Sequence, residues 1–288
     1  MIDKHLFCFG LGYSAIALAR SLKQQGWRVS GTCRSAEKQS RLNDLGIAAT
    51  IFDRDSAIPD LFIRLRGVTH VLSSVPPDGQ GDPVIDLHGA EIAAVAGRLN
   101  WIGYLSTTGV YGDRGGGWVD ESSELKPSGV RGQRRVEAEQ AWVSLPQPAH
   151  LFRLAGIYGP GRSALDTVRE GHAKRIVKPG QVFSRIHVAD IVQIIEASIA
   201  RPNPGTAYNL CDDDPAPPSD VIAFACDLLG VPSPPEIDFE RAVLSPMARS
   251  FYDDNKRVRN DRIKNELGVT LRYPSFRLGL AALHADGY

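Results

Sequence analysis

Three small residues near the start of the chain, Gly10, Gly12 and Ala15, have the spacing of a phosphate-binding turn. A glycine at position 10 permits a tight turn, and one at position 12 lets the backbone approach a pyrophosphate closely. Ala15 allows close packing of a helix on the preceding strand, and a helix starting at Tyr13 and Ser14 would present N–H groups and a positive dipole end to the phosphates. The pattern indicates a dinucleotide site. The alternative is a tight turn that holds no ligand.

The segments on both sides of this turn fit the elements that must position it. The apolar run at 6–9 has the length of one buried strand, and apolar residues then recur at helical spacing up to Gly26. A second apolar run begins at Trp27. Strand, turn, helix and strand make up a βαβ unit. The sequence therefore predicts an α/β fold, with a doubly wound, Rossmann-type parallel sheet and a smaller C-terminal substrate lobe.

The end of the second strand carries a cation where dehydrogenases selective for NAD usually carry a carboxylate. That carboxylate bonds the ribose 2′-hydroxyl, but this chain has Arg34 and Ser35, followed by Lys38. A guanidinium can bind a 2′-phosphate through two hydrogen bonds, and Ser35 can donate another. These residues favour NADP over NAD. The alternative is a solvated, charged start of a helix.

Two further strands end in residues that could contact a dinucleotide. The strand predicted at 48–52 runs into Asp53, which could reach the adenine or serve as a turn residue. The strand at 70–75 ends in Ser74 and Val75 and is followed by a loop at 76–83. Ligands of open α/β sheets bind at the carboxyl ends of the strands, so we expect Ser74 and Val75 to lie beside the cofactor.

Composition and charge argue against several classes of protein. The chain of 288 residues has 33 basic and 33 acidic residues and zero formal net charge, so nothing points to a nucleic acid or an anionic membrane as a partner. No apolar run is long enough to span a membrane, and the N-terminal residues fit a strand rather than a signal peptide. The cysteines show no C-x-x-C spacing and the histidines form no metal-binding pair. We therefore expect a cytoplasmic protein with reduced thiols and no metal.

The second informative stretch is STTGVYGDRGGG at 106–117, after a strand predicted at 101–105. Hydroxyls at the end of a strand can hydrogen-bond a substrate carbonyl or alcohol, and the glycines at 115–117 favour a mobile loop. Together with the first βαβ unit, this stretch resembles the extended short-chain dehydrogenases/reductases, the group of epimerases and dehydratases that act on sugar nucleotides. The resemblance places Thr107 at the family's catalytic Ser/Thr, three residues before Val110.

The resemblance continues almost to the end of the chain, through 151–162, 183–199, 206–230 and 267–283. We expect residues 1–150 to form the dinucleotide-binding domain. Residues 151–288 would return strands to the sheet and build the smaller substrate lobe. Related enzymes pair through two helices, which correspond to 84–99 and 129–142 here, and this implies a homodimer.

The predicted helix at 127–142 departs from the family pattern, which is Tyr-x-x-x-Lys. When Gly132 and Glu139 are aligned with the family, Arg131 takes the tyrosine position and Arg135 the lysine position. The family's phenol exchanges the substrate proton, whereas an arginine stays protonated and is a poor general acid or base. Arg135 could still bond the nicotinamide ribose. The chain thus resembles the atypical members, which keep the fold and often the nucleotide but lose the tyrosine.

Other residues are candidates for the missing chemistry. Tyr111 is the phenol nearest to Thr107 in sequence and could donate the substrate proton, although a packed aromatic ring is the favoured alternative. Arg131 could clamp a carboxylate or phosphate, or it could lie on a solvated helix face. Three further arginines lie in segments expected on the substrate side and suit an anionic or nucleotide-linked small molecule. They are Arg153, Arg162 and Arg185.

Two functions of different kinds fit these observations. The first is an NADP-dependent oxidoreductase or epimerase/dehydratase-like enzyme acting on an anionic small molecule or sugar nucleotide, with Thr107, Tyr111 and Arg135 as its catalytic residues. The alternative is a non-catalytic sensor or scaffold that binds a dinucleotide and has lost the catalytic tyrosine. A weaker third hypothesis is that the first turn holds FAD.

Overall fold

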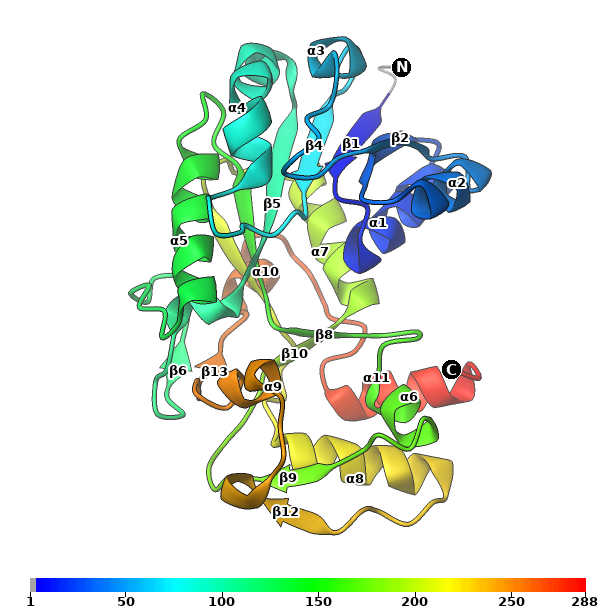
Figure 1. The fold of residues 1–288 in the computed structure, drawn as a ribbon, viewed down its shortest axis with the longest axis vertical. Helices are drawn as coiled ribbons and strands as arrows, with labels where there is room; N and C mark the ends of the chain where they lie inside the picture. The colour runs from blue at the N-terminus through cyan, green and yellow to red at the C-terminus, as the bar shows by residue number, and fades with distance from the viewer. Residues whose placement is uncertain (1–3) are drawn as a thin grey trace. The chain divides into compact units, whose positions relative to one another are not determined.

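A seven-stranded sheet is the main element of the computed structural model, which describes residues 4–288 (Figure 1). The strands from β3 to β5 pair in parallel, in the order β3-β2-β1-β4-β5. The order reverses at β1, because β2 and β3 add to one side of it and β4 and β5 to the other. This topology confirms the predicted doubly wound, Rossmann-type sheet. Across the sheet the strands are β11 (Ala207–Leu210), β7 (His150–Leu154), β5 (Trp101–Thr107), β4 (His70–Ser73), β1 (His5–Phe9), β2 (Arg28–Cys33) and β3 (Ala48–Ile51).

The chain divides into two compact units that are discontinuous in sequence. The first contains the residues up to Thr107, together with Gln133–Arg153 and Ile195–Tyr208. The second contains Thr108–Gly132, Leu154–Ile194 and Asn209–Tyr288. Segments from both halves of the sequence contribute to each unit.

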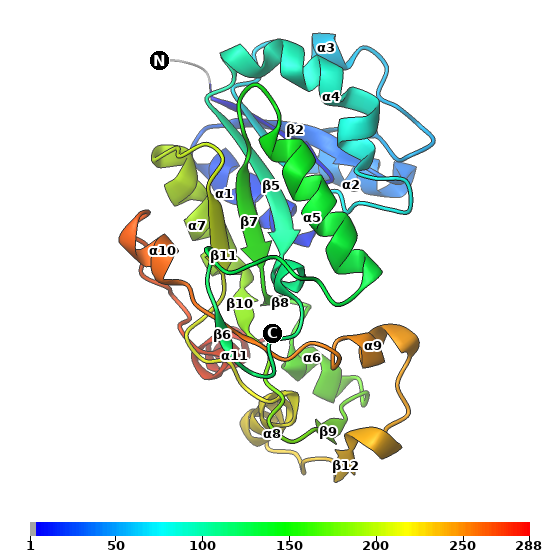
Figure 2. The same ribbon diagram turned by 90° about the vertical axis from the view of Figure 1, so that its left-hand side faces the viewer.

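Helices cover both faces of the sheet in the first unit. Figures 1 and 2 show α4 and α5 on one face and α1 with the C-terminal part of α7 on the other. Hydrogen bonds fix α7 on its face, because Trp101 Nε1 donates to Ser198 Oγ over 3.1 Å and Ser21 Oγ donates to Glu196 Oε1 over 2.6 Å. The helices beside the sheet are α1 (Tyr13–Gln24), α2 (Ala36–Asp44), α3 (Leu61–Arg64), α4 (Pro83–Val95), the 3-10 turn η1 (Ala96–Arg98), α5 (Val130–Val143) and α7 (Val188–Ala200).

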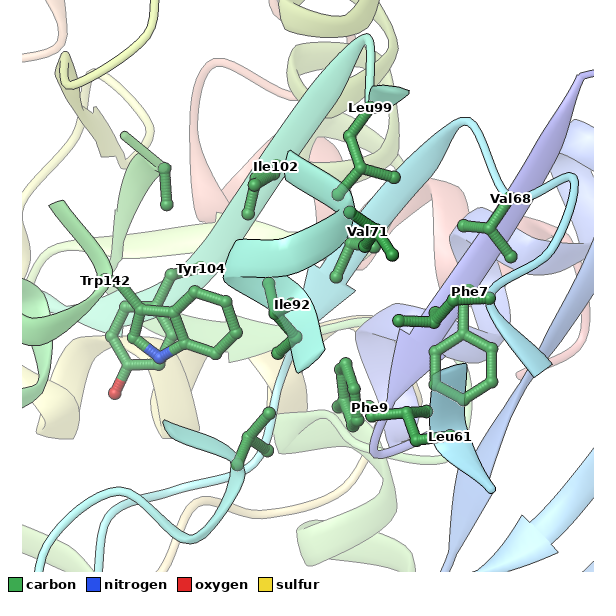
Figure 3. Close-up of a cluster of buried hydrophobic side chains, with 14 of the residues drawn as sticks. Phe7, Phe9, Leu61, Val68, Val71, Ile92, Leu99, Ile102, Tyr104 and Trp142 are labelled. Carbon is green, nitrogen blue, oxygen red and sulfur yellow. The ribbon is translucent and has the colours of Figure 1, made fainter. Parts of the chain in front are cut away.

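One core cluster lies between the sheet and helices α3, α4 and α5. Figure 3 shows Phe7 and Phe9 of β1 beside Leu61 of α3, and Trp142 of α5 against Tyr104 of β5. Aliphatic side chains from strands and helices fill the space between these aromatic rings. They include Val68, Val71, Ile92, Leu99 and Ile102, which are all labelled in Figure 3.

Glycine at position 31 is required by the close approach of the first two strands. Gly31 of β2 lies opposite Cys8 of β1, and a Cβ at position 31 would come within 2.3 Å of the Cys8 carbonyl oxygen. Any larger residue would push β2 away from β1. Gly31 is therefore explained by the close packing of the two backbones, and not by the apolar periodicity of the strand.

The second unit contains three short parallel strand pairs and five helices, together with 3-10 turns and the first residues of α5 and α7. One of its core clusters lies among α6, α8 and α11, and includes Leu165, Ala225, Phe276 and Leu280. The strand pairs are β8 (Gly156–Tyr158) with β10 (Arg185–His187), β9 (Arg175–Val177) with β12 (Glu236–Asp238), and β6 (Trp118–Val119) with β13 (Arg257–Val258). The α-helices are α6 (Ala164–Arg169), α8 (Pro218–Leu229), α9 (Pro246–Ser250), α10 (Asp261–Asn265) and α11 (Phe276–Ala285), and the 3-10 turns are η2 (Thr108–Tyr111) and η3 (Phe239–Arg241).

Within residues 4–288, no helix is long and apolar enough to cross a membrane.

Candidate functional site

The turn between β1 and α1 has the backbone conformation that its sequence predicts. Gly10 has a φ of +79°, which favours glycine, and its N–H donates to Thr32 Oγ1 over 2.7 Å. Its carbonyl accepts a hydrogen bond from the hydroxyl of Ser74. A Cβ at position 10 would lie 3.0 Å from Ser74 Oγ and 3.1 Å from Val75 Cγ2. Gly10, Ser74 and Val75 therefore come together where β1 and β4 end.

Gly12 differs from Gly10 because it has open space on its side-chain side. It precedes the first residue of α1, with a φ of −82°, and a Cβ there would meet only Ser74 Oγ, at 3.8 Å. Tyr13 is half-buried, while Ser14 and Ala15 are buried against the sheet. The first N–H groups of an α-helix have no partner within the helix. The turn can thus offer an accessible backbone and a helix N-terminus to an anion.

The residues after β2 lie at the surface of the first unit. Arg34 is exposed, and among the described residues it forms no ion pair. Ser35 is the N-cap of α2, and its Oγ accepts a hydrogen bond from the N–H of Lys38 over 3.3 Å. In this cap the Ser35 oxygen accepts one hydrogen bond, so its O–H group can still donate a hydrogen bond to another partner.

Asp53 stands in a local turn after β3. Its Oδ1 accepts a hydrogen bond from the N–H of Asp55 over 3.0 Å, and its backbone bridges to Ser56. These contacts are those of a turn residue, the alternative that the sequence left open. They leave the second carboxylate oxygen for a ligand.

Arg54, the next residue, ties the end of β3 to the loop after β4, and sequence reasoning missed it. Its Nε and Nη2 donate to the two carboxylate oxygens of Asp78 over 2.9 and 2.8 Å, and Nη1 donates to Asp86 over 2.6 Å. Nη2 also donates to the carbonyl of Gly81 over 3.1 Å. The hydrogen bonds from Arg54 lower the pKa of Asp78. No local sequence signal indicates such a pairing, because the partners are 24 and 32 residues away.

The candidate residues at the end of β5 and just after it, Thr107 and Tyr111, differ in their burial. Thr107 is half-buried at the end of β5, and Ser106 is buried. Tyr111 is fully buried, and its hydroxyl donates to Asn209 Oδ1 over 2.7 Å within the second unit. This burial and hydrogen bond favour a packed aromatic ring over the proton-donor role for Tyr111.

The glycine-rich loop at 113–117 is held by Asn255. The carbonyl of Asn255 accepts from the N–H groups of Arg114 and Gly116 over 3.0 and 2.9 Å, and its own N–H donates to Asp113 Oδ1 over 2.8 Å. The side chain of Arg257 also bonds the carbonyl of Gly116. These contacts anchor the loop, in contrast to the mobility that its glycines favoured.

Helix α5 carries Arg131 at its second residue and Arg135 one turn later, the two arginines expected at the Tyr and Lys positions. Arg131 is exposed, and its Nη2 donates to Ser250 Oγ over 2.6 Å while the guanidinium lies 5.3 Å from the ring centre of Phe251. Arg135 is half-buried, and its Nη1 donates to Tyr104 OH over 3.1 Å and to the carbonyl of Leu105 over 2.7 Å. Arg135 therefore sits against the carboxyl end of β5, where a cofactor contact remains open to it.

The three arginines expected on the substrate side have different surroundings. Arg153 is buried and paired with Glu139, with Nη2 2.8 Å from Oε2. Arg185 donates from Nη1 to the carbonyls of Phe183 and Ala216 over 2.8 and 3.0 Å, and burial lowers its pKa. Arg162 is exposed on the loop after β8. The ion pair makes it costly for Arg153 to turn toward a substrate anion, because the buried carboxylate of Glu139 would lose its counter-charge.

A buried polar cluster beside Arg185 was not anticipated from the sequence. His187 packs against the rings of Tyr158 and Tyr273, at centroid distances of 5.1 and 4.2 Å, and burial lowers its pKa to about 4. Asp212 follows β11, is 1% exposed, and has a pKa raised to about 8 by burial. Among residues 4–288 there is no group of three or more His, Cys, Asp or Glu side chains that could hold a metal ion.

Comparisons with known proteins add to this picture. No model of a protein family matches the chain. The chain is 28% identical to protein YeeZ of Escherichia coli over 287 residues, which is 94% of this chain and 97% of the relative. A solved structure of a conserved protein of unknown function from Silicibacter pomeroyi is 54% identical, with 99% of each chain covered and a TM-score of 0.92. A protein from Methylobacillus flagellatus, assigned to the NAD-dependent epimerases/dehydratases, is 25% identical, with 100% and 99% covered and a TM-score of 0.74.

More distant solved structures share the fold. A dTDP-glucose 4,6-dehydratase from Bacillus anthracis, in complex with NAD, is 16% identical, with 97% and 94% of the chains covered and a TM-score of 0.75. A human epimerase family protein with NADPH is 15% identical, with 98% and 99% covered and a TM-score of 0.74. The order of the strands in the sheet, the glycine turn and these similarities all indicate the same fold. The chain therefore has the fold of the epimerase/dehydratase-like short-chain dehydrogenases/reductases, and its helix α5 carries no tyrosine.

Proposed function

We propose that the protein binds a nicotinamide dinucleotide at the turn formed by Gly10, Gly12 and the start of α1. The observation that carries this proposal is the contrast between the two glycines: Gly10 is closely surrounded, while the space beside Gly12 is open. The strand order also reverses between β1 and β4, and ligands of open α/β sheets bind at such a point. The dehydratase that contains NAD and the human protein that contains NADPH have the same fold.

Native mass spectrometry of the purified protein tests this proposal. The expected spectrum contains a species heavier than the chain by one NADP or NAD, either as purified or after incubation with the nucleotide. A stoichiometric FAD, or no bound species even at saturating nicotinamide dinucleotide, would refute the proposal.

The dinucleotide of this proposal is NADP, held by Arg34 and Ser35, with Asp53, Ser74, Val75 and Arg135 as further contacts. Arg34 is an exposed cation at the carboxyl end of β2, where a 2′-phosphate would need one. The helix N-terminus at Tyr13, Ser14 and Ala15 would receive the pyrophosphate. A fluorescence titration in which NADH binds more tightly than NADPH would overturn the preference for NADP.

The reaction proposed is an oxidation–reduction or an epimerase/dehydratase-like step on an anionic small molecule or sugar nucleotide. Thr107 would hydrogen-bond the reacting oxygen of the substrate, and Arg135 would bind the cofactor. Arg131, Arg162 and Arg185 of the second unit are the proposed groups for a substrate anion. A panel of sugar nucleotides, aldehydes and ketones, followed through the absorbance of the nicotinamide, tests for turnover. Activity that Thr107→Ala leaves unchanged would argue against a role for its hydroxyl.

The second candidate is a sensor or scaffold that binds the dinucleotide without turnover. It is favoured by α5, which carries no tyrosine, and by Arg131, whose guanidinium contacts Ser250 and Phe251. Tight binding of NADPH without turnover across the panel would support it, and turnover of any one substrate would exclude it.

A homodimer through α4 and α5 is also part of the proposal. The apolar residues Ile92 and Val95 of α4 are buried in the core of the first unit, so an interface would use other faces of these helices. Light scattering after size-exclusion chromatography would distinguish a dimer near twice the 31.3 kDa chain from a monomer.

A further inference from the structure

The hydroxyl of Tyr104 has a single described partner, the guanidinium of Arg135. Tyr104 is fully buried in β5, and its ring stacks on Trp142 with a centroid distance of 5.6 Å and an interplanar angle of 18°. A phenylalanine would fill the same space and stack on Trp142 in the same way. The oxygen adds nothing to that packing and must lose its hydration to be buried there. Its contact with Arg135 at 3.1 Å is therefore the feature that distinguishes Tyr104 from a core phenylalanine.

Arg135 is anchored through one nitrogen only. Nη1 donates both to Tyr104 OH and to the carbonyl of Leu105, and within residues 4–288 neither Nε nor Nη2 donates a hydrogen bond. The guanidinium also lies 5.7 Å from the centre of the Tyr104 ring. A guanidinium is a rigid, planar fork, so fixing one nitrogen sets the direction of the other two. The anchored side chain thus presents two unengaged donor groups.

Tyr104 is itself held by a rigid set of contacts. Trp142, which stacks on it, donates from Nε1 to Asp82 Oδ2 over 2.9 Å. The other oxygen of Asp82 caps α4 by accepting from the N–H groups of Val84 and Ile85 over 2.9 and 3.1 Å. The orientation of Arg135 is therefore connected through Tyr104 and Trp142 to the start of α4. This start follows the loop at the carboxyl end of β4.

Two buried hydroxyls near Tyr104 have no hydrogen-bond partner among the described residues. Ser73 is paired with Tyr104 across β4 and β5, and Ser106 is two residues beyond Tyr104 on the same face of β5. Both are buried, and within residues 4–288 neither Oγ has a hydrogen-bond partner. An unsatisfied buried hydroxyl is unfavourable, so such groups need an explanation. Two buried hydroxyls without a partner among the described residues therefore lie near the end of β5.

We infer that Tyr104 is a positioning residue, which orients Arg135 so that Nε and Nη2 bind the dinucleotide. This inference rests on the proposed function. In this arrangement Arg135 holds the ribose hydroxyls of the cofactor, and Tyr104 holds Arg135 in place. Tyr104 does not touch the ligand, and its phenol, whose pKa is raised by burial, stays neutral and accepts the hydrogen bond from Arg135.

A double-mutant cycle on NADPH affinity tests the inference. Tyr104→Phe keeps the ring on Trp142 and removes only the oxygen, and Arg135→Met removes the donors but keeps the length of the side chain. We expect Tyr104→Phe to weaken NADPH binding about 5- to 10-fold and Arg135→Met to weaken it about 10-fold or more. In the Arg135→Met background, Tyr104→Phe should cause no further loss, because the phenol acts only through Arg135.

Tyr208→Phe is the matched control. Tyr208 is also fully buried in the first unit and stacks on an aromatic ring, that of Phe152, at a centroid distance of 6.2 Å. We expect this variant to bind NADPH as the wild type does. Thermal unfolding of each variant shows whether a change in affinity accompanies a change in stability.

Three results would overturn the inference. The first is wild-type affinity in Tyr104→Phe, even if its melting temperature falls, since the hydroxyl would then be structural. The second is an equal loss from Tyr104→Phe with and without Arg135, which would make the two residues independent. The third is a wild-type protein that binds neither NADPH nor NADH, which also refutes the proposed function, whereas the first two leave dinucleotide binding intact.

Discussion

Arg153 and Glu139 form an ion pair inside the first unit, with side chains only 6% and 3% exposed and Nη2 2.8 Å from Oε2. Arg153 Nε also donates to both carboxylate oxygens, over 3.1 and 3.3 Å. The pair joins α5 to β7, two elements that flank the proposed cofactor contact of Arg135. Glu139 occupies the position of a family glutamate four residues after the lysine. Its role here is therefore to hold the helix that carries Arg135.

Removing one member of this pair should be far more damaging than removing both. Arg153→Met leaves the Glu139 carboxylate buried without its partner, which should lower the free energy of unfolding by about 3 to 5 kcal/mol. Adding Glu139→Leu should restore most of that stability, because two apolar side chains of similar volume need no compensation. Urea unfolding of the single and the double variant measures both free energies of unfolding.

The exposed pair of Arg41 and Glu37 on α2 provides the comparison. Its side chains are 69% and 80% exposed, so Arg41→Met should change stability by no more than about 0.5 kcal/mol. Equal effects of Arg153→Met and Arg41→Met would show that the buried pair contributes no more than a surface contact.

Gly12→Ala should separate ligand binding from folding. The backbone at Gly12 has an ordinary φ of −82°, and the new methyl would meet only Ser74 Oγ, at 3.8 Å, so the melting temperature should stay close to that of the wild type. The methyl would occupy the space proposed for the pyrophosphate, so NADPH affinity should fall about tenfold or more. Calorimetric titration and thermal unfolding of the same sample measure the two effects.

Gly10→Ala is the matched comparison for this prediction. Its φ of +79° and its contacts with Ser74 and Val75 should lower stability by about 1 to 3 kcal/mol. If Gly12→Ala also unfolds the protein, or if it binds NADPH normally, the pyrophosphate does not lie beside Gly12.

Arg34→Ala should weaken NADPH and leave NADH almost unchanged. A charge-assisted hydrogen bond to a phosphate that is lost on truncation corresponds to a change in NADPH affinity of about 10- to 100-fold. NADH has no 2′-phosphate, so its affinity should change by about twofold or less. Fluorescence titration with both nucleotides gives the ratio.

Arg41→Ala is a suitable control for Arg34→Ala, since it removes the same charge from the exposed helix α2. Both affinities should then stay at their wild-type values. A parallel fall of both affinities in Arg34→Ala would mean that Arg34 acts on the common part of the nucleotides.

The first βαβ unit shows what sequence alone could establish. Glycine spacing and apolar periodicity located β1, the turn, α1 and β2, because these are local properties of the backbone. The tyrosine missing from α5 was also visible in the sequence. By contrast, the surroundings of Arg153 and Arg54 depend on partners that tertiary packing brings together: Glu139 lies 14 residues away, and Asp78 lies 24 residues away.

Tyr104 illustrates the same limit for the candidate site. In the sequence Tyr104 is one aromatic residue of a strand predicted to be buried, and nothing in the sequence indicates a partner for its hydroxyl. Its contact with Arg135 depends on the side-by-side placement of β5 and α5, which are separated by 31 residues at this point. The burial of Tyr111 likewise depends on Asn209, which is 98 residues away.

Ser73→Ala should be neutral or slightly stabilising, within about 0.5 kcal/mol, because the Ser73 hydroxyl is buried and has no partner among the described residues. Ser198 is equally buried, but its oxygen accepts from Trp101 Nε1. Ser198→Ala should therefore cost about 1 to 3 kcal/mol, since it leaves a buried donor unsatisfied. Chemical denaturation compares the two variants. A large loss of stability in Ser73→Ala would show that its hydroxyl is engaged by a bound water or ligand.

Asp212 should make the protein less stable as the pH rises from about 4 to 8. The carboxyl of the unfolded chain ionises near 3.8, whereas burial raises its pKa in the folded protein to about 8. Between these values the folded protein holds one proton more than the unfolded chain, so stability falls with increasing pH. A difference of this size corresponds to at most about 6 kcal/mol, lost by pH 8.

Asp212→Asn removes this titration. Relative to the wild type, the variant should gain stability steadily between pH 5 and pH 8 and the gain should level off above pH 8, as measured by urea unfolding at each pH. The comparison isolates Asp212 from His187, whose pKa is lowered to about 4 and which acts in the opposite sense, since its contribution is lost as the pH falls below 6.5. A constant difference between variant and wild type over this range would mean that Asp212 is already ionised in the folded protein, with the nearby Arg185 as its counter-charge.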